Sequence, residues 1–312
     1  MKQITLLDGG LGQEINSRAD HQQSHPLWSV KVMHDQPELV IDVHKDFIRA
    51  GAKVLGLNNY TATITRMTRH QMGDMFDATH KLAIELMTTA IDQSGIDRKD
   101  INIAGCLPPL AASYVASEAH GYQRSFDEYC QLIEIQEAGV ELFLVETISN
   151  IEEAEAAIDA LAEFDQPAYI GLTLADEMTD AIDDEPMPRL RSGERLDEAV
   201  QMLSDKQVTA AMINCSFPEI VSLAMPVLAR SGLVFGGYAN GFTSIDGLVP
   251  GGTVDSLKAR CDLSPSQYAD YVFDWIDAGA TIIGGCCEIS PEHIGYLHDR
   301  MIADDITPVK LV

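Results

Sequence analysis

The chain has 312 residues, of which 46% are hydrophobic, and it carries 48 Asp and Glu against 21 Lys and Arg, for a formal net charge of −27. This size and apolar content suffice for one large core, and we expect residues 1–312 to form a single domain. The acidic residues are spread along the chain, so they indicate a solvated surface or adaptation to a salty habitat. Such a surface excludes nucleic acids and anionic membranes as partners and leaves small-molecule substrates, with assembly of identical copies left open.

No stretch approaches the about 18 apolar residues that span a bilayer. The first residues reach Asp8 and two glycines too soon for a signal peptide. The sequence therefore predicts a cytoplasmic protein. In that compartment, six cysteines indicate metal binding or catalysis rather than a disulfide framework, and Cys286 and Cys287 are adjacent.

Short apolar runs alternate with amphipathic patterns along the chain. We expect strands at residues 4–7, 53–57, 101–105, 142–146, 168–172, 210–214, 233–238 and 281–284. Their continuous apolar character is typical of parallel strands that are covered on both faces. The spacing of apolar residues between them predicts helices. Eight repeats of strand and helix predict an α/β protein, a (β/α)₈ TIM barrel with a closed, parallel, eight-stranded sheet. An open doubly wound sheet is the second choice.

Several helix ends carry clear signals. An Asn or Ser that precedes a helical pattern predicts N-caps at Asn150, Ser264 and Ser290. Glycines between a helical pattern and the next strand predict left-handed C-caps at Gly51, Gly139 and Gly279.

Side chains that can bind ligands or take part in catalysis lie at the carboxyl ends of the predicted strands. They are Asp8, Tyr60, Cys106, Glu146, Asn214, Cys215, Asn240, Cys286 and Cys287. In a parallel barrel these ends share one rim, and active sites are built there. The sequence therefore predicts one site at this rim.

Three of these residues are candidate metal ligands. The thiolates of Cys215, Cys286 and Cys287 could hold zinc at about 2.3 Å each and leave a fourth position for a ligand. Adjacent cysteines on a regular strand point to opposite faces, but Gly284 and Gly285 let the backbone leave extended geometry. Spacing alone leaves two alternatives open, namely buried apolar cysteines and a disulfide between the adjacent pair.

Six segments together resemble one known family. They are residues 6–12 (LLDGGLG), 26–29 (PLWS), 43–52, 146–148 (ETI), 213–215 (INC) and 283–287 (IGGCC). This set is similar to the homocysteine S-methyltransferase family, which includes betaine– and S-methylmethionine–homocysteine methyltransferases and the homocysteine-binding module of cobalamin-dependent methionine synthase. The resemblance runs from the first strand to the eighth. It implies a methyltransferase of methionine biosynthesis that transfers a methyl group to the thiol of homocysteine.

The resemblance also implies roles for particular residues. Cys215, Cys286 and Cys287 are the implied ligands of a Zn²⁺ cofactor, and the homocysteine thiol takes the open position. Bound zinc deprotonates a thiol at neutral pH, so no general base is needed. Glu146 is the implied partner of the homocysteine ammonium group. Its alternative is a strand-end residue paired with a base of the barrel.

The first strand supplies further candidates. Asp8 is expected to make a second ammonium contact, so Asp8 and Glu146 are the proposed catalytic-site carboxylates. Gly9 and Gly10 are expected to offer backbone N–H groups to the homocysteine carboxylate. The alternative for this segment is a tight turn after the strand.

Asn214, Trp28 and Tyr60 complete the candidate substrate site. We expect Asn214 to hold the Cys215 loop by hydrogen bonds. Trp28 could cover the site or attract a cationic methyl donor through its ring, and packing under a long loop is the alternative. Tyr60 has the same two interpretations.

Three segments depart from the family pattern, at residues 58–62, 105–109 and 238–242. All three are expected on the donor side of the site, so the donor is the less determined substrate. No cobalamin or folate module is expected to follow the barrel, and S-methylmethionine is the first choice. Betaine or dimethylsulfoniopropionate is the second. Two other classes stay open: a non-catalytic barrel that binds zinc and a thiol, and a zinc hydrolase or lyase with Glu146 as its base.

Overall fold

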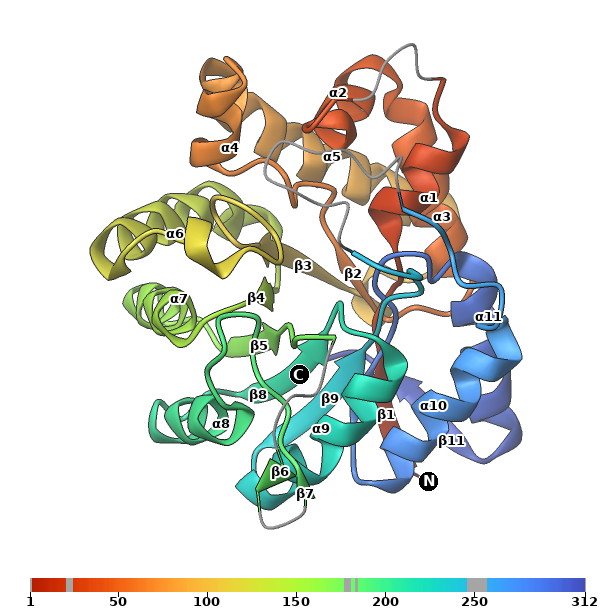
Figure 1. Ribbon diagram of the computed structural model, residues 1–312. Coiled ribbons are helices and arrows are strands. Elements are labelled where there is room, and N and C mark those ends of the chain that lie inside the picture. Colours follow the sequence, from red (N-terminus) through yellow and green to blue (C-terminus); the bar gives the residue numbers. More distant parts are fainter. Residues whose placement is uncertain (1, 21–24, 177–180, 183–184, 246–256, 312) are drawn as a thin grey trace.

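A computed structural model describes residues 2–20, 25–176, 181–182, 185–245 and 257–311. Its centre is a curled parallel sheet of nine strands in the order β11-β1-β10-β9-β8-β5-β4-β3-β2 (Figure 1). These strands are β1 (Lys2–Leu6), β2 (Val54–Gly56), β3 (Asn102–Leu107), β4 (Leu142–Ile148), β5 (Ala168–Leu172), β8 (Ala210–Asn214), β9 (Val234–Tyr238), β10 (Ile282–Ile283) and β11 (Ile306–Val309). The fold is therefore α/β and resembles a TIM barrel.

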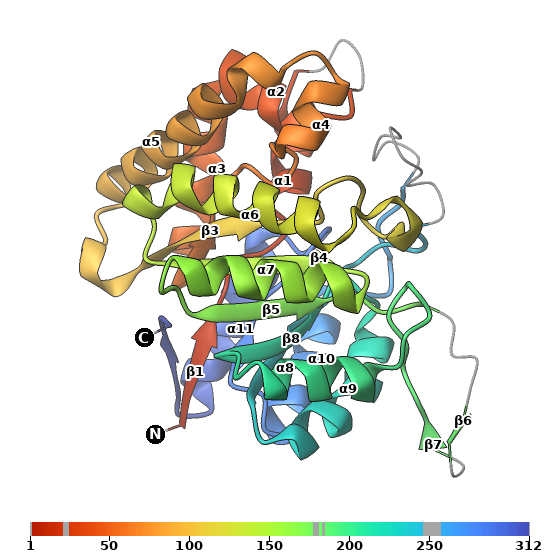
Figure 2. The same ribbon diagram turned by 90° about the vertical axis from the view of Figure 1, so that its left-hand side faces the viewer.

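Helices surround the sheet (Figure 1). They are α1 (Leu11–Arg18), α2 (Trp28–Asp35), α3 (Pro37–Arg49), α4 (Ile64–Arg69), α5 (Phe76–Ser94), α6 (Tyr122–Gln136), α7 (Ile151–Glu163), α8 (Leu196–Asp205), α9 (Pro218–Ser231), α10 (Pro265–Asp277) and α11 (Pro291–Ala303). Short 3₁₀ turns are η1 (Gly73–Met75), η2 (Arg98–Asp100), η3 (Ala116–Glu118) and η4 (Glu137–Gly139). A small hairpin of β6 (Ala181–Ile182) and β7 (Glu185–Pro186) projects from the body in Figure 2. Within the described ranges, no helix is long and apolar enough to cross a membrane.

All eight predicted strands are present, but the predicted closed eight-stranded sheet is not what forms. β11, which the sequence analysis missed, pairs with β1 from Lys2 to Thr5 and brings the two ends of the chain side by side (Figure 2). It occupies the edge of β1 that β2 would otherwise share. The contact between β1 and β2 is reduced to one bridge between Leu7 and Val54. Beside it, the amide of Lys53 donates to the carbonyl of Leu6 at 2.8 Å, and the amide of Asp8 donates to the carbonyl of Val54 at 3.0 Å.

The predicted helix caps are mostly confirmed. Asn150, Ser264 and Ser290 are N-caps, and Gly51 and Gly279 have φ values of +100° and +109°. The prediction for Gly139 is wrong. This residue lies in η4 without a positive φ, and a Cβ there would lie 2.5 Å from a methyl group of Ile84. Glycine is needed at 139 because two elements pack closely, not because a helix is capped there.

Two apolar clusters hold the fold together. The larger lies between the sheet and the helices. The smaller one includes Leu7, Val54, Ala104, Leu142, Leu144, Tyr169, Ala210, Met212, Tyr238 and Ile282, one or two residues from each of the eight predicted strands. Side chains thus fill the inside of the curled sheet, as in TIM barrels, so a substrate cavity has to form in the loops at the carboxyl ends of the strands.

Candidate active site

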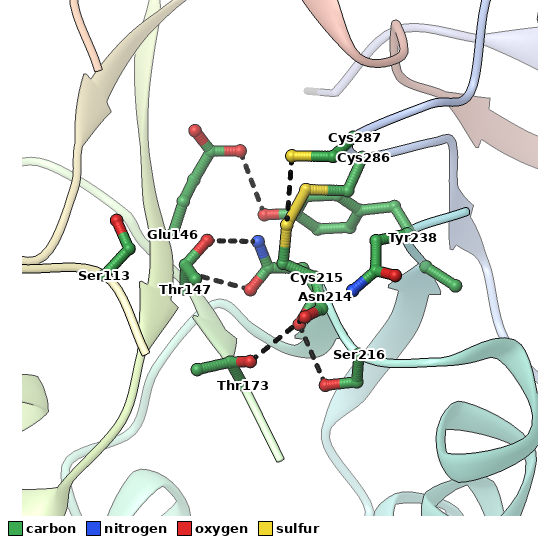
Figure 3. Close-up of a disulfide and its surroundings, with 12 residues drawn as sticks. Ser113, Glu146, Thr147, Thr173, Asn214, Cys215, Ser216, Tyr238, Cys286 and Cys287 are labelled. Carbon is green, nitrogen blue, oxygen red and sulfur yellow. Dashed lines mark hydrogen bonds between the residues drawn. A yellow bond between two sulfur atoms is a disulfide. The ribbon is translucent and has the colours of Figure 1, made fainter. Parts of the chain in front are cut away.

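The three candidate cysteines converge at the carboxyl ends of β8 and β10, where their sulfur atoms all lie within 4.8 Å of one another (Figure 3). Cys215 and Cys286 are joined in a disulfide, and the Sγ atoms of Cys215 and Cys287 are 3.8 Å apart. The alternative of a disulfide between the adjacent cysteines, Cys286 and Cys287, is therefore wrong. A disulfide sulfur is not a thiolate, so this pair must be reduced before both sulfurs can bind a metal.

The reduced cysteines would suit zinc. Tetrahedral coordination with bonds near 2.3 Å places two thiolates about 3.8 Å apart, which matches the separation of Cys215 and Cys287. Burial raises the pKa of the Cys287 thiol to about 12, so this sulfur needs a bound cation to be a thiolate at neutral pH. Soft sulfur donors of this number and spacing are typical of zinc sites.

The loop that contains Cys286 and Cys287 packs against the segments that follow β1 and β9. The amide of Cys286 donates to the carbonyl of Ala239 at 2.9 Å, and the amide of Gly10 donates to the carbonyl of Ile289 at 2.8 Å. A Cβ at Gly9 would lie 2.2 Å from the carbonyl oxygen of Ile289, and one at Gly10 would lie 2.6 Å from that of Cys286. Gly9 and Gly10 thus let the cysteine loop pack closely against the backbone. The N–H of Gly10 was expected to face a substrate carboxylate, but it donates to Ile289 instead.

Asn214 connects β8 to β4. Its amide oxygen accepts from the backbone N–H of Thr147 at 2.8 Å, and its amide nitrogen donates to the Thr147 hydroxyl at 2.9 Å (Figure 3). Thr147 and Cys215 both have positive φ values, of 63° and 47°. Each is a strained conformation for a residue with a side chain, and the paired hydrogen bonds hold both turns in place.

Glu146 ends its strand beside the cysteines and receives two hydrogen bonds. The Tyr238 hydroxyl donates to Oε1 at 3.1 Å, and the Cys106 thiol donates to Oε2 at 3.2 Å. Burial raises the pKa of Glu146 above its usual value, and it also raises that of Cys106. Cys106 is therefore a neutral donor that helps to orient this carboxylate.

Asp8 faces the same cavity. Its Oδ2 accepts from the backbone N–H of Gly56 at 3.0 Å. Burial raises the pKa of Asp8, and the nearby charge of Glu146 raises it further. A cation placed between these two carboxylates would lower the raised pKa of each.

One cavity of about 270 Å³ holds all of these groups. Cys215, Cys286 and Cys287 line it together with Asp8, Gly9, Gly10, Glu146, Asn214, Trp28 and Tyr60. Every residue predicted for the substrate and metal sites thus borders this space. Trp28 begins α2, and its ring lies against Gly12, where a Cβ would be 3.3 Å away.

The sequence analysis missed several residues of this cavity, and two of them, Tyr114 and Arg66, bear on its chemistry. The Tyr114 hydroxyl donates to Sγ of Cys215 at 3.0 Å, and the guanidinium of Arg191 lies 5.0 Å from the Tyr114 ring. Arg66, in α4, also lines the cavity. Arg66 follows β2 in α4, and Tyr114 lies in the loop after β3, so only the fold brings them to the cysteines.

Comparisons with known proteins agree on one family. A family model described as homocysteine S-methyltransferase matches residues 5–301. The homocysteine S-methyltransferase of Escherichia coli strain K12 is 29% identical, with 95% of each chain covered. Homocysteine S-methyltransferase 2 of Arabidopsis thaliana is 26% identical, with 95% of this chain and 92% of the relative covered. The metallated form of the homocysteine methyltransferase MmuM from Escherichia coli superposes with a TM-score of 0.76 at 27% identity, with 96% of both chains covered.

Proposed function

Because the chain belongs to the homocysteine S-methyltransferase family and is therefore a methyltransferase, we propose that it methylates the thiol of homocysteine to give methionine, with zinc as its cofactor and a sulfonium donor. One observation carries this proposal. Three cysteine sulfurs within 4.8 Å of one another border a cavity that also holds two buried carboxylates. We also propose that residues 1–312 act as one domain, since strands from Lys2 to Val309 share one sheet.

The acceptor would bind across this cavity. Cys215, Cys286 and Cys287, once reduced, would hold zinc, and the acceptor thiol would take the remaining position. When bound, zinc would lower the pKa of that thiol and supply a thiolate at neutral pH. The acceptor ammonium would lie between Asp8 and Glu146, whose raised pKa values a cation would lower again.

The remaining residues hold this arrangement in place. Tyr238 and Cys106 orient the Glu146 carboxylate from its two oxygens. Asn214 fixes the turns at Thr147 and Cys215. Tyr114 donates to the Cys215 sulfur and would fix one metal ligand. These groups therefore set the direction in which the acceptor sulfur faces the donor.

The reaction itself is a displacement at the methyl carbon. The acceptor sulfur forms a bond to that carbon as the bond to the donor sulfur breaks. The bonding pair goes to the donor sulfur, which leaves as a neutral thioether. Trp28 and Tyr60 border the cavity, and their rings suit a donor with a cationic centre. S-methylmethionine is the first donor to test, and dimethylsulfoniopropionate and betaine follow.

The test is a methyl-transfer assay with the reduced, zinc-loaded protein, homocysteine and each of the three donors. The carbon skeleton of homocysteine carries a ¹³C label, because S-methylmethionine yields methionine on both sides of the reaction and the departing methionine keeps one donor methyl. We expect labelled methionine from a sulfonium donor and none from the Cys215→Ala variant. Bound zinc without labelled methionine from any donor would contradict the proposal and favour a non-catalytic barrel that binds zinc and a thiol.

A further inference from the structure

The cavity has a basic wall on the side of the sheet opposite Cys215. Arg66, Arg69 and His70 border the cavity from α4 and the residue that follows it. In the order of the sheet, three strands separate β2, which precedes α4, from β8, which precedes Cys215. Through the bridge between Leu7 and Val54, three strands also separate them in the other direction. The basic wall and Cys215 therefore belong to opposite sides of the curled sheet.

Arg66 is the member of this wall that has a buried nitrogen without a hydrogen-bond partner. One of its terminal nitrogens donates to the carbonyl of Pro109 at 2.7 Å and to the hydroxyl of Ser113 at 3.2 Å. Its Nε is buried and has no hydrogen-bond partner, and no carboxylate of the described residues forms an ion pair with it. Burial lowers the pKa of Arg66, although an arginine remains charged at every physiological pH. A half-buried guanidinium that borders the cavity and forms no ion pair with a described residue is suited to bind an anionic ligand group.

The surroundings of Arg66 link it to the reacting centre. Ser113, which it contacts, also shares a hydrogen bond of 2.9 Å with the Tyr60 hydroxyl, and the Arg66 guanidinium lies 5.5 Å from the Tyr60 ring. The next residue, Tyr114, donates to Cys215. Figure 3 shows Ser113 and the cysteines on opposite sides of Glu146 in that view. One loop therefore connects the basic wall to the candidate metal ligand across the cavity.

We propose that Arg66 binds the carboxylate of the methyl donor and so selects donors that carry one. This inference rests on the proposed methyl transfer. In an in-line displacement the acceptor sulfur, the methyl carbon and the donor sulfur are aligned, so the donor would occupy a part of the cavity that the cysteines and the acceptor leave free, and Arg66 borders this cavity. The basic wall repels a donor that is only cationic, whereas a zwitterionic donor can turn its carboxylate to Arg66 and its methyl group to the acceptor. The acceptor carboxylate is the other source of the same chemistry, and the experiment separates the two.

The experiment compares the wild type with Arg66→Gln, using substrates matched in all but the carboxylate. The donors are S-methylmethionine and its analogue without the carboxylate, (3-aminopropyl)dimethylsulfonium. The acceptors are homocysteine and 3-aminopropanethiol. Arg49→Gln is the control, because it removes the same charge from an exposed side chain on the outside of the protein. KM and kcat are measured for each pair, and donor binding is measured separately by calorimetry, with dimethylsulfoniopropionate and betaine as further ligands.

We expect Arg66→Gln to lower kcat/KM for S-methylmethionine by about ten- to a hundredfold, mainly through KM, because it removes a charge-assisted hydrogen bond. The analogue without the carboxylate should change less than about threefold, and the preference between acceptors should stay as in the wild type. Equal losses for both donors would show that Arg66 only supports the loop through Pro109 and Ser113. If kcat/KM falls for homocysteine but not for 3-aminopropanethiol, Arg66 binds the acceptor carboxylate instead. A wild type that binds none of the donors with a carboxylate would also overturn the proposal.

The binding measurement keeps this proposal separate from the proposed function. A wild type that binds S-methylmethionine through Arg66 but forms no methionine contradicts methyl transfer and supports the donor site. If the wild type forms methionine and the Arg66→Gln variant keeps the same preference between donors, the result supports methyl transfer and contradicts the donor site.

Discussion

The side-chain amide of Asn214 forms two hydrogen bonds with Thr147, one to its backbone N–H and one to its hydroxyl. Asn214 precedes a cysteine of the candidate metal site, and Thr147 follows Glu146. The part of the cavity that would hold the acceptor thiol is thus tied to the part that would hold its ammonium group. Both tied turns, at Thr147 and Cys215, have positive φ values that cost about 1–3 kcal/mol each when nothing holds them.

Replacing Asn214 should loosen both parts at once. We expect Asn214→Ala to lower the free energy of unfolding by about 2–4 kcal/mol, because it leaves a buried N–H and a buried hydroxyl of Thr147 without partners. Urea unfolding measures this loss, and metal analysis of the reduced protein should show weaker zinc retention. Thr147→Val is the matched control, since it removes one of the two bonds and should cost about half as much. Equal losses in the two variants would contradict the role given to the Asn214 amide.

The three cysteines should act as a set in metal binding. After reduction, we expect about one zinc ion per wild-type chain and a loss of tight binding in Cys215→Ala, Cys286→Ala and Cys287→Ala. The fold should remain, because a core of this size does not depend on a metal. Without reduction the wild type should bind little zinc, since Cys215 and Cys286 are joined. Cys261→Ala, at an exposed thiol, serves as the control. A cysteine whose removal leaves zinc content unchanged is not a ligand.

Glu146 should affect acceptor binding rather than metal binding. We expect Glu146→Gln to keep zinc and to weaken homocysteine binding by about ten- to a hundredfold, the usual effect of losing one charge-assisted hydrogen bond. If Glu146 were instead the base of a hydrolase, turnover would fall by about 10²–10⁴-fold with substrate binding largely kept. Titration calorimetry and single-turnover rates on the same variant distinguish the two results.

The pH dependence of acceptor binding follows from the same carboxylates. The pKa values of Asp8 and Glu146 are both raised, so on acidification these groups take up protons at a higher pH than exposed carboxylates do. Protonation removes the negative charge that binds an ammonium group. Homocysteine affinity should therefore fall as the pH is lowered towards these raised values, and Glu146→Gln should reduce the slope. An affinity that is flat across this range would argue against ammonium binding at this pair.

His44 should make the whole fold sensitive to acid. Its side chain is fully buried in α3, both ring nitrogens lack a hydrogen-bond partner among the described residues, and burial lowers its pKa to about 3. Between the ordinary histidine pKa of about 6.5 and this value, the unfolded chain binds a proton that the folded chain does not. Stability should therefore fall as the pH drops through this window, by up to about 1.4 kcal/mol per pH unit from this group.

The substitution His44→Leu tests this contribution. It should reduce the dependence of the unfolding free energy on pH between about 6.5 and 4, while stability at pH 8 changes less because the buried imidazole is neutral there. The measurement is urea unfolding at several pH values. His298, which lies on α11 and pairs with Asp299, provides a control position. An unchanged slope in His44→Leu would mean that other groups cause the acid sensitivity.

What the sequence by itself determined was mostly local. Apolar runs and helix-capping residues placed all eight predicted strands within a few residues, because strand and helix formation depend on patterns in neighbouring residues. Polar residues at the carboxyl ends of those strands also indicated the site, since parallel strands bring these ends to one edge. The family resemblance rested on the same short segments, and the family model that matches residues 5–301 confirms it.

Only the tertiary structure decided which distant groups meet. It paired Cys215 with Cys286 rather than Cys286 with Cys287, and it used Gly9 and Gly10 to admit the cysteine loop. In the structure, β11 pairs with the edge of β1 that would pair with β2 in a closed barrel. Tyr114, from a loop, and Arg66, from α4, also line the cavity, although neither belongs to a recognisable motif. The reason is physical: these contacts join residues far apart in the chain, and their partners depend on how loops pack against one another, which no local pattern of side chains encodes.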